Sequence, residues 1–383
     1  MTSRQAAERL GVKLETLYAY VARGLLRGIA KNGAAPHGRR YAEHELEGFL
    51  ARRRWSRRVV ASAVSSTDGG RLLYRGRDAV ALAERSSFEE VASLLWAGEP
   101  EDGREWPEVA AGRLESATRA AGAVRGAPPV VQAQILVAAL TAEDETRSAT
   151  DGASVRATAT KLVTRLVAGF AVVRGRPLEA SSRGPMAARV LSALGGRPTS
   201  TSVRMTDRAL VLSAEHELNA STFAARVAAS TDADPYAVVG AGIATLSGPK
   251  HGGMTDRVDA MFRARRSPDE DAPLGFGHPL YPDGDPRTPP LLAAARGAAR
   301  RGSVLAALFA SLDAMAARGR PAPTVDVGLV ATSLALGLDP GLASMLFAFG
   351  RTAGWIAHAI EQYAMGELIR PRARYVGPLP EGG

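Results

Sequence analysis

The sequence predicts a mainly α-helical protein made of a small basic N-terminal module and a large helical body that is nearly neutral. After residue 59, apolar residues recur at helical spacing along most of the chain. Residues 1–58 hold 13 Lys and Arg against 5 Asp and Glu, which is a surplus of eight out of a net charge of +9 for all 383 residues. Such an uneven distribution indicates two modules with different partners, although a solvated charged arm is an alternative.

The N-terminal module has the pattern of a small DNA-binding domain. Residues 3–23 read as two short helices interrupted at Gly11. Residues 25–41 read as a hairpin with an Asn32-Gly33 turn signal, and residues 42–54 read as a further helix. This order resembles the winged helix-turn-helix domain of MerR-like and excisionase-like proteins.

That resemblance implies that residues 1–54 contact DNA. It places the second helix, 14–23, in the major groove and the hairpin arginines against phosphates. The residues expected to face DNA are Thr16, Tyr18, Tyr20, Arg23, Arg39 and Arg40. Small helix-turn-helix units also bind proteins, so a protein partner is the alternative. Residues 55–58 read as a basic linker, or as a tail that contacts phosphates.

The body is predicted to be helical except for short strands within 58–76. It contains no uncharged apolar run long enough to span a bilayer, and the chain starts without an apolar signal region, so we expect a soluble cytoplasmic protein. The absence of Cys excludes disulfides, thiolate nucleophiles and Cys-ligated zinc. The expected helices are 88–97, 129–141, 153–174, 186–195, 203–229, 235–247, 254–265, 287–301, 303–317, 326–338 and 340–366.

Three of the six histidines lie in short segments that contain glycine, proline or acidic residues. These segments are Ala-Glu-His216-Glu-Leu-Asn, Gly-Pro-Lys-His251-Gly-Gly and Gly-Phe-Gly-His278-Pro, and Thr-Val-Asp326-Val-Gly follows them. Histidine changes its charge near neutral pH, where it serves as an acid or a base. Histidines and a carboxylate on glycine-rich turns therefore favour acid–base chemistry on a small molecule.

Each of these residues also has a purely structural interpretation. Asp326 begins the predicted helix 326–338, where Asp is a preferred N-cap residue. His216 falls inside the predicted helix 203–229, where it could be an ordinary core or surface histidine. His251 precedes a helix and could be a hydrogen-bonded loop residue.

The ordered set of segments resembles the citrate synthase family, over most of residues 59–378. The resemblance implies a large domain (59–253 and 362–383) and a small domain (254–361), with the active site between them. It also implies a homodimer in which Arg370 completes the site of the partner. Besides the four segments above, the matching pieces are Asp68–Gly76, Ser87–Trp96, Gly350–His358 and Arg370-Pro-Arg372.

The resemblance implies condensation of acetyl-CoA with oxaloacetate and hydrolysis of citryl-CoA to citrate and CoA, an acyltransferase reaction of the tricarboxylic acid cycle. Asp326 would remove the methyl proton, His251 would hold the enol oxygen and His278 would polarise the acceptor carbonyl. Oxaloacetate would be bound by His216, Arg287, Arg351 and Arg370, with the arginines on its carboxylates. No metal or other cofactor is expected, since the chain has no metal-ligand spacing.

Two other functions remain open. The segment around His216 also occurs in relatives that use propionyl-CoA, which suggests a 2-methylcitrate synthase. A DNA-binding regulator whose body senses oxaloacetate or an acyl-CoA is the third interpretation. Asp326 favours catalysis, because a sensor needs no base. The chain departs from the usual family pattern at Met254 and at Pro279, and these changes bear on acyl-chain size and CoA contacts.

Overall fold

The computed structural model describes residues 1–10, 12–22, 26, 40–43, 46, 60–101, 106–266, 268, 274–373 and 375–377. The chain divides into two compact units. Met1–Ala61 and Arg370–Gly383 form one unit, and Ser62–Ile369 forms the other. In the described part of the chain, no helix is long and apolar enough to cross a membrane.

The N-terminal unit contains a pair of short helices, α1 (Ser3–Arg9) and α2 (Leu14–Ala22). Thr2 caps α1 by a reciprocal arrangement, in which its hydroxyl accepts from Gln5 N–H and the Gln5 side chain accepts from Thr2 N–H. This confirms the two helices predicted over 3–23, whereas most of the predicted hairpin 25–41 lies outside the described residues. The core of this unit is formed by Ala6, Ala7, Leu10, Leu17, Leu26, Tyr41 and Leu46.

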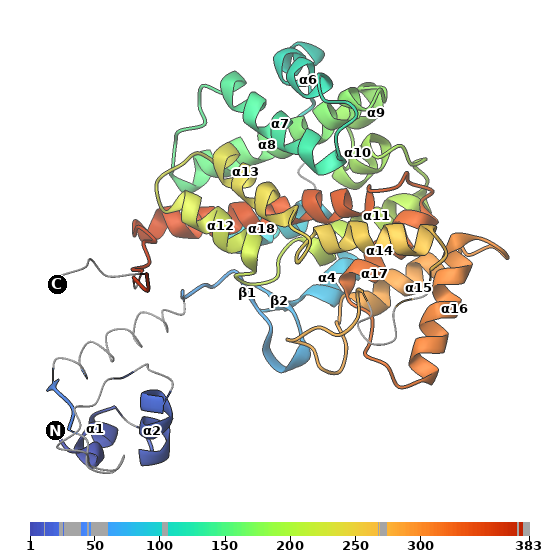
Figure 1. Cartoon of the computed structure of the whole chain (residues 1–383). Helices are drawn as coiled ribbons and strands as arrows, with labels where there is room; N and C mark the ends of the chain where they lie inside the picture. Colours follow the sequence, from blue (N-terminus) through green and yellow to red (C-terminus); the bar gives the residue numbers. More distant parts are fainter. Residues whose placement is uncertain are drawn as a thin grey trace. The chain divides into compact units, whose positions relative to one another are not determined.

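The body, Ser62–Ile369, is almost entirely helical, as predicted (Figure 1). Its small antiparallel sheet has the order β1 (Ser65–Ser66), β2 (Leu73–Tyr74) and β3 (Arg77–Asp78), inside the segment predicted to form strands. The α-helices are α4 (Ala79–Arg85), α5 (Phe88–Ala97), α6 (Glu115–Gly122), α7 (Pro129–Leu140), α8 (Gly152–Val173), α9 (Glu179–Ser182), α10 (Met186–Ala193), α11 (Ser200–Ser213), α12 (Ala220–Ala229), α13 (Pro235–Leu246), α14 (Gly253–Arg263), α15 (Thr288–Arg296), α16 (Val304–Ala317), α17 (Val325–Ala335) and α18 (Ala343–Met365). Short 3-10 helices are η2 (Asp68–Gly70), η3 (Ala111–Arg113) and η4 (Thr141–Glu143).

The long helix α18 lies at the centre of the body (Figure 1). It packs against α5, α8, α11, α12 and α13, and every residue from Ala343 to Ala359 is buried. A helix that is buried all round belongs to the interior of a large helical domain. Around α18 lies a first hydrophobic cluster, and a second one joins α14, α15, α16 and α17. The predicted boundaries of the large domain and the small domain stay predictions.

Two glycines of α18 let α11 and the turn after it come close to the helix. A Cβ at Gly350 would lie only 2.6 Å from the Leu210 carbonyl oxygen. A Cβ at Gly354 would overlap the Glu215 carboxylate and the Ala214 carbonyl. Backbone and a buried carboxylate cannot move aside cheaply, so only glycine permits this approach. The turn 214–219 is therefore held directly against α18.

The prediction of a single helix over 203–229 is wrong, because two helices, α11 and α12, occupy this segment. Between them Glu217 has a φ of 51°, a left-handed conformation that ends the helical path. The Asn219 side chain then caps α12 by accepting the N–H groups of Ser221 and Thr222. His216 consequently lies in a turn, where its ring can point away from the helix surface.

Candidate active site

Six of the seven residues predicted for catalysis and substrate binding line one cavity of about 330 Å³. They are His216, His251, His278, Arg287, Asp326 and Arg351. The seventh, Arg370, belongs to the unit that contains the N-terminal residues, and its predicted place in a partner's site stays a prediction. The other lining residues are Asn219, Lys250, Met254, Gly275, Phe276, Gly277, Pro279, Thr324, Val325 and Phe347.

A pairing of two loops brings His278 and Asp326 to the same cavity. Phe276, two residues before His278, forms an isolated β-bridge with Pro323, which precedes α17 and its residue Asp326. Gly275 begins this loop with a φ of 79°, and a Cβ there would lie 2.9 Å from the side chains of α14 and α17. The glycine therefore permits both the left-handed backbone and the close packing of the loop.

Asp326 lies in the first turn of α17, where the N-cap position belongs to Thr324, so the N-cap interpretation of Asp326 is wrong. Its two carboxylate oxygens accept hydrogen bonds from Thr255 Oγ1 at 2.6 Å and Thr324 Oγ1 at 2.9 Å. Burial raises the pKa of Asp326, while these two hydroxyls and Arg287 oppose the increase. A carboxylate whose pKa is raised is a better proton acceptor than one in water.

The three cavity histidines are neutral at pH 7. Burial lowers the pKa of His216 well below its usual range, lowers that of His251 to about 4, and also lowers that of His278. The positive charge of Arg287 adds to the decrease at all three rings, and Arg351 adds to it at His216 and His251. Neutral rings can donate one N–H each without placing another cation in the cavity.

Hydrogen bonds orient these rings. His278 Nδ1 accepts the backbone N–H of Leu280 at 3.2 Å, so the proton of the neutral ring is on Nε2. His216 Nε2 lies 2.9 Å from the Tyr281 hydroxyl oxygen. The rings of His216 and His278 meet edge to face with their centroids 5.3 Å apart. His251 Nε2 lies 2.7 Å from Ser221 Oγ.

The two arginines of the cavity differ in their partners. Arg287 forms a two-point ion pair with Asp285, with Nε–Oδ1 and Nη2–Oδ2 distances of 2.9 and 2.7 Å. Arg351 donates from Nε to the Ser213 carbonyl at 2.7 Å, but among the described residues its Nη1 and Nη2 have no hydrogen-bond partner. Arg287 is therefore neutralised by the protein, and Arg351 keeps two free donor groups.

Arg351 is charged although it is almost fully buried. Burial lowers its pKa to about 10, and the nearby carboxylate of Glu215 opposes the decrease. Its guanidinium also lies over the Phe347 ring, 4.8 Å from the centroid. A buried cation with unsatisfied donors is costly, and a carboxylate in the cavity would satisfy it with two hydrogen bonds.

Several residues that hold the site together were not among those predicted from the sequence. Asp285 could have been found, because it stands two residues before Arg287, and Tyr281 follows His278 closely. Ser221 carries no such signal, because its contact with His251 depends on the packing of α12 against the turn between α13 and α14. Trp355 of α18 also contacts this serine, since its indole N–H donates to Ser221 Oγ at 3.2 Å.

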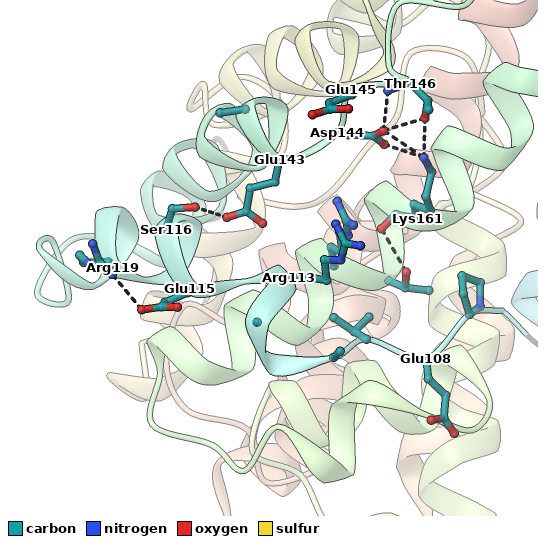
Figure 2. Close-up of a pocket in the computed structure, with 17 residues that line it drawn as sticks. Glu108, Arg113, Glu115, Ser116, Arg119, Glu143, Asp144, Glu145, Thr146 and Lys161 are labelled. Atoms are coloured by element: carbon teal, nitrogen blue, oxygen red, sulfur yellow. Dashed lines mark hydrogen bonds and ion pairs between the residues drawn. The ribbon is translucent and has the colours of Figure 1, made fainter.

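A second and larger cavity, of about 920 Å³, lies beside α6 and α8 (Figure 2). Two pairs of its charged side chains bond to one another. Asp144 and Lys161 are 2.9 Å apart, Glu115 and Arg119 are 3.0 Å apart, and Glu143 bonds to a serine hydroxyl (Figure 2). The seven predicted residues do not line it, so the candidate chemistry belongs to the smaller cavity.

The residues predicted to face DNA lie in the N-terminal unit. Thr16 and Tyr18 are half-buried on α2, while Tyr20 packs partly against the core of the unit. Arg40 is exposed and forms an isolated β-bridge with Thr2. The remaining two predicted contacts, Arg23 and Arg39, lie outside the described residues.

Comparisons with known proteins cover both units. Residues 55–372 match the citrate synthase C-terminal domain, and residues 1–54 match a helix-turn-helix domain. Citrate synthase 2 of Bacillus subtilis is 31% identical over 370 residues, which covers 88% of this chain and 96% of the relative. A 2-methylcitrate synthase 2 of Corynebacterium glutamicum is 32% identical and covers 80% of this chain and 88% of the relative.

Solved structures agree with these matches. A citrate synthase from Thermoplasma acidophilum, in a ternary complex with carboxymethyl coenzyme A and oxaloacetate, has a TM-score of 0.73 at 25% identity. The match covers 87% of this chain and 97% of that chain. The citrate synthase from Thermotoga maritima has a TM-score of 0.69 at 26% identity and covers 85% of this chain and 95% of that chain. The chain therefore belongs to the citrate synthase family, a family of enzymes, and carries a helix-turn-helix domain in residues 1–54.

Proposed function

We propose that this protein is a citrate synthase that condenses acetyl-CoA with oxaloacetate and hydrolyses the product to citrate and CoA. The observation that carries this proposal is the pair of amino groups on buried Arg351 that have no hydrogen-bond partner among the described residues. Arg351 lines the same cavity as Arg287 and three neutral histidines. Oxaloacetate offers two carboxylates and a ketone to these groups. The Thermoplasma acidophilum relative in complex with oxaloacetate supports this choice of substrate.

In the first step, Asp326 takes a proton from the methyl carbon of acetyl-CoA. Its raised pKa favours this transfer. Neutral His251 donates a hydrogen bond to the thioester oxygen as the enol forms, which stabilises the charge that develops there. If the Ser221 hydroxyl donates to His251 Nε2, the ring proton is on Nδ1 and is free for that oxygen.

In the second step, the enol carbon attacks the ketone carbon of oxaloacetate. The Nε2–H of His278 donates to the ketone oxygen and supplies the proton for the new hydroxyl, giving citryl-CoA. Arg287 and Arg351 hold the carboxylates of oxaloacetate, and His216 contributes to the same binding surface. Water then cleaves the thioester, which releases citrate and the CoA thiol. The proposal includes no metal and no other cofactor.

Release of the CoA thiol tests this proposal directly. Purified protein should turn over oxaloacetate with acetyl-CoA faster than with propionyl-CoA, and omission of oxaloacetate should abolish the release. A faster reaction with propionyl-CoA would make it a 2-methylcitrate synthase, the activity for which its Corynebacterium glutamicum relative is named. No turnover with either thioester at high enzyme concentration would contradict both enzyme activities. It would favour a protein that senses oxaloacetate or an acyl-CoA.

We also propose a cytoplasmic homodimer in which Arg370 of each subunit completes the partner's site. Two inactive variants, Asp326→Asn and Arg370→Ala, test whether Arg370 acts in the partner's site. They are mixed under conditions in which their subunits exchange. In a mixed dimer the subunit with intact Asp326 receives an intact Arg370 from its partner, so turnover returns. If mixing restores no activity although mixed dimers form, Arg370 does not act across the dimer.

For the N-terminal module, we propose that residues 1–58 bind duplex DNA through α2 and the basic residues around it. The support is the helix-turn-helix match together with the surplus of eight positive charges. Binding through phosphates releases counterions, so the affinity of the full-length protein for DNA should fall steeply with salt concentration. Binding that is absent, or that does not change with salt, would favour a protein partner instead.

A further inference from the structure

We infer that Glu215 is a positioning residue that controls the affinity for oxaloacetate. A buried series of hydrogen bonds, Arg226–His358–Glu215, holds the Glu215 carboxylate near Arg351. It keeps this carboxylate from forming an ion pair with the Arg351 guanidinium. This inference rests on the proposed function, because it assigns Arg351 to a carboxylate of oxaloacetate.

The series of hydrogen bonds begins at Arg226 on α12 and continues through His358 on α18. Arg226 Nη1 lies 2.9 Å from His358 Nδ1, and an arginine can only donate, so Nδ1 accepts and the ring proton is on Nε2. That Nε2–H donates to Glu215 Oε1 at 3.2 Å. Arg226, His358 and Glu215 are all at most 1% exposed. Arg226 is itself held by Glu361 at 2.6 Å and by Gln362 at 2.8 Å.

A second tether acts on the same oxygen of Glu215. Ser65 Oγ on β1 donates to Glu215 Oε1 at 3.2 Å and accepts the backbone N–H of Glu217 at 3.0 Å. The backbone of Glu215 is held by the Tyr74 hydroxyl, which accepts its N–H at 3.2 Å. One carboxylate oxygen and the backbone on both sides of His216 are therefore fixed by contacts from β1, β2 and α18.

The other carboxylate oxygen remains free beside the substrate arginine. Arg351 Nε bonds to the Ser213 carbonyl, two residues before Glu215, and Glu215 is the main negative charge that opposes the lowering of the Arg351 pKa. Within the described part of the chain, Glu215 Oε2 and Arg351 Nη1 and Nη2 nevertheless have no hydrogen-bond partner. An untethered glutamate would form a two-point ion pair with this guanidinium, because such pairs are favourable when buried side by side.

The arrangement separates two effects of one carboxylate. The charge of Glu215 stabilises the buried cation of Arg351 before substrate binds. The hydrogen bonds to Glu215 Oε1 leave the amino groups of Arg351 available to substrate. Removing the charge and removing the tether should therefore change the affinity for oxaloacetate in opposite directions. A residue that merely stabilises the turn around His216 would weaken binding in both cases.

The experiment compares oxaloacetate binding to the full-length protein by calorimetry, together with KM and kcat, for two single variants. Glu215→Gln keeps the shape but removes the negative charge near the bound carboxylate, so oxaloacetate should bind more tightly, by about three- to tenfold. His358→Phe removes one of the two donors that restrain Glu215 and leaves only the exchangeable Ser65 hydroxyl. The carboxylate should then pair with Arg351 and weaken oxaloacetate binding by about tenfold. The KM for acetyl-CoA should change little in either variant.

The double variant and a rescue variant distinguish the tether from general disruption. With Gln at 215, no carboxylate is left to compete, so adding His358→Phe should cost little further affinity. His358→Gln can still donate to Glu215 and should bind oxaloacetate nearly as the wild type does, which also covers a failure of the Phe variant to fold. Glu179→Gln, at an exposed surface ion pair with Arg183, is the matched control and should change nothing.

Weaker binding in both single variants, or additive losses in the double variant, would overturn this inference while the wild type still binds oxaloacetate. A wild-type protein that neither binds nor turns over oxaloacetate would overturn the proposed function, and this inference with it. The two failures are thus distinguished by the behaviour of the wild type.

Discussion

Ser221 Oγ lies 2.7 Å from Nε2 of His251 and joins this ring to the centre of the body. The same oxygen accepts the indole N–H of Trp355 at 3.2 Å and lies 2.9 Å from Asn219 Oδ1. The hydroxyl has one proton and two acceptors for it, His251 Nε2 and Asn219 Oδ1. When the proton goes to His251, the ring presents its own N–H from Nδ1, as enol stabilisation requires.

Ser221→Ala should lower kcat for acetyl-CoA by about 100-fold, because His251 loses the contact that selects its tautomer. Binding of oxaloacetate should change little, since the serine does not line the cavity. Steady-state kinetics with both substrates measures this split. Ser247→Ala removes an exposed hydroxyl near the end of α13 and should leave kcat unchanged. Equal loss in both variants would contradict the role of Ser221.

Asp326→Asn should lower turnover by about 1000-fold, because the amide cannot accept the methyl proton. The substitution keeps the shape of the side chain, so oxaloacetate should still bind with nearly its original affinity. Single-turnover release of CoA and calorimetric titration measure the two properties. If the variant retains the full rate, another group is the base.

Replacing Arg351 by Met should change binding and stability in opposite directions. Oxaloacetate affinity should fall by at least about 30-fold, because a buried two-point contact with a carboxylate is lost. The unliganded protein should become more stable, since a desolvated cation with unsatisfied donors is removed. Thermal unfolding with and without oxaloacetate measures both effects, and Arg119→Met, at an exposed ion pair, is the control. A less stable unliganded protein would contradict the expected cost of this cation.

The contribution of the three cavity histidines to the free energy of unfolding should rise as the pH increases from about 4 to 6.5. Buried carboxyl groups with a raised pKa, such as Asp326 and Asp207, contribute in the opposite direction. The folded-state pKa of His251 is lowered to about 4, and those of His216 and His278 are also lowered. Between the folded and unfolded values, the unfolded chain binds more protons, so stability increases with pH and levels off above about 6.5. Denaturant titrations across this range measure the slope. His251→Asn should make it shallower, and an unchanged slope would mean that His251 is not buried as a neutral ring.

Much of the fold could be predicted because its signals are local. The helical spacing of Phe88–Ala97 and the caps before it lie within one segment, and the observed helix has those bounds. The turn at 214–219 could not be read in this way, because Ala-Glu-His-Glu-Leu is compatible with a helix. It is a turn because Glu217 adopts a left-handed conformation and because Gly354 of the distant helix α18 leaves room for it.

The candidate site shows the same division. Residue type, order and glycine-rich context by themselves predicted the candidate groups for the chemistry, since His251, His278 and Asp326 are recognisable within short segments. Only the tertiary structure decided their states, because pKa values and free donors depend on what surrounds a side chain in space. Arg287 is neutralised by Asp285, whereas the two amino groups of Arg351 have no partner in the part of the chain that the structure describes, although both are arginines of one family pattern. Burial and packing against elements that are distant in the sequence make the environments of the two arginines different. Neither can be read from the order of residues along the chain.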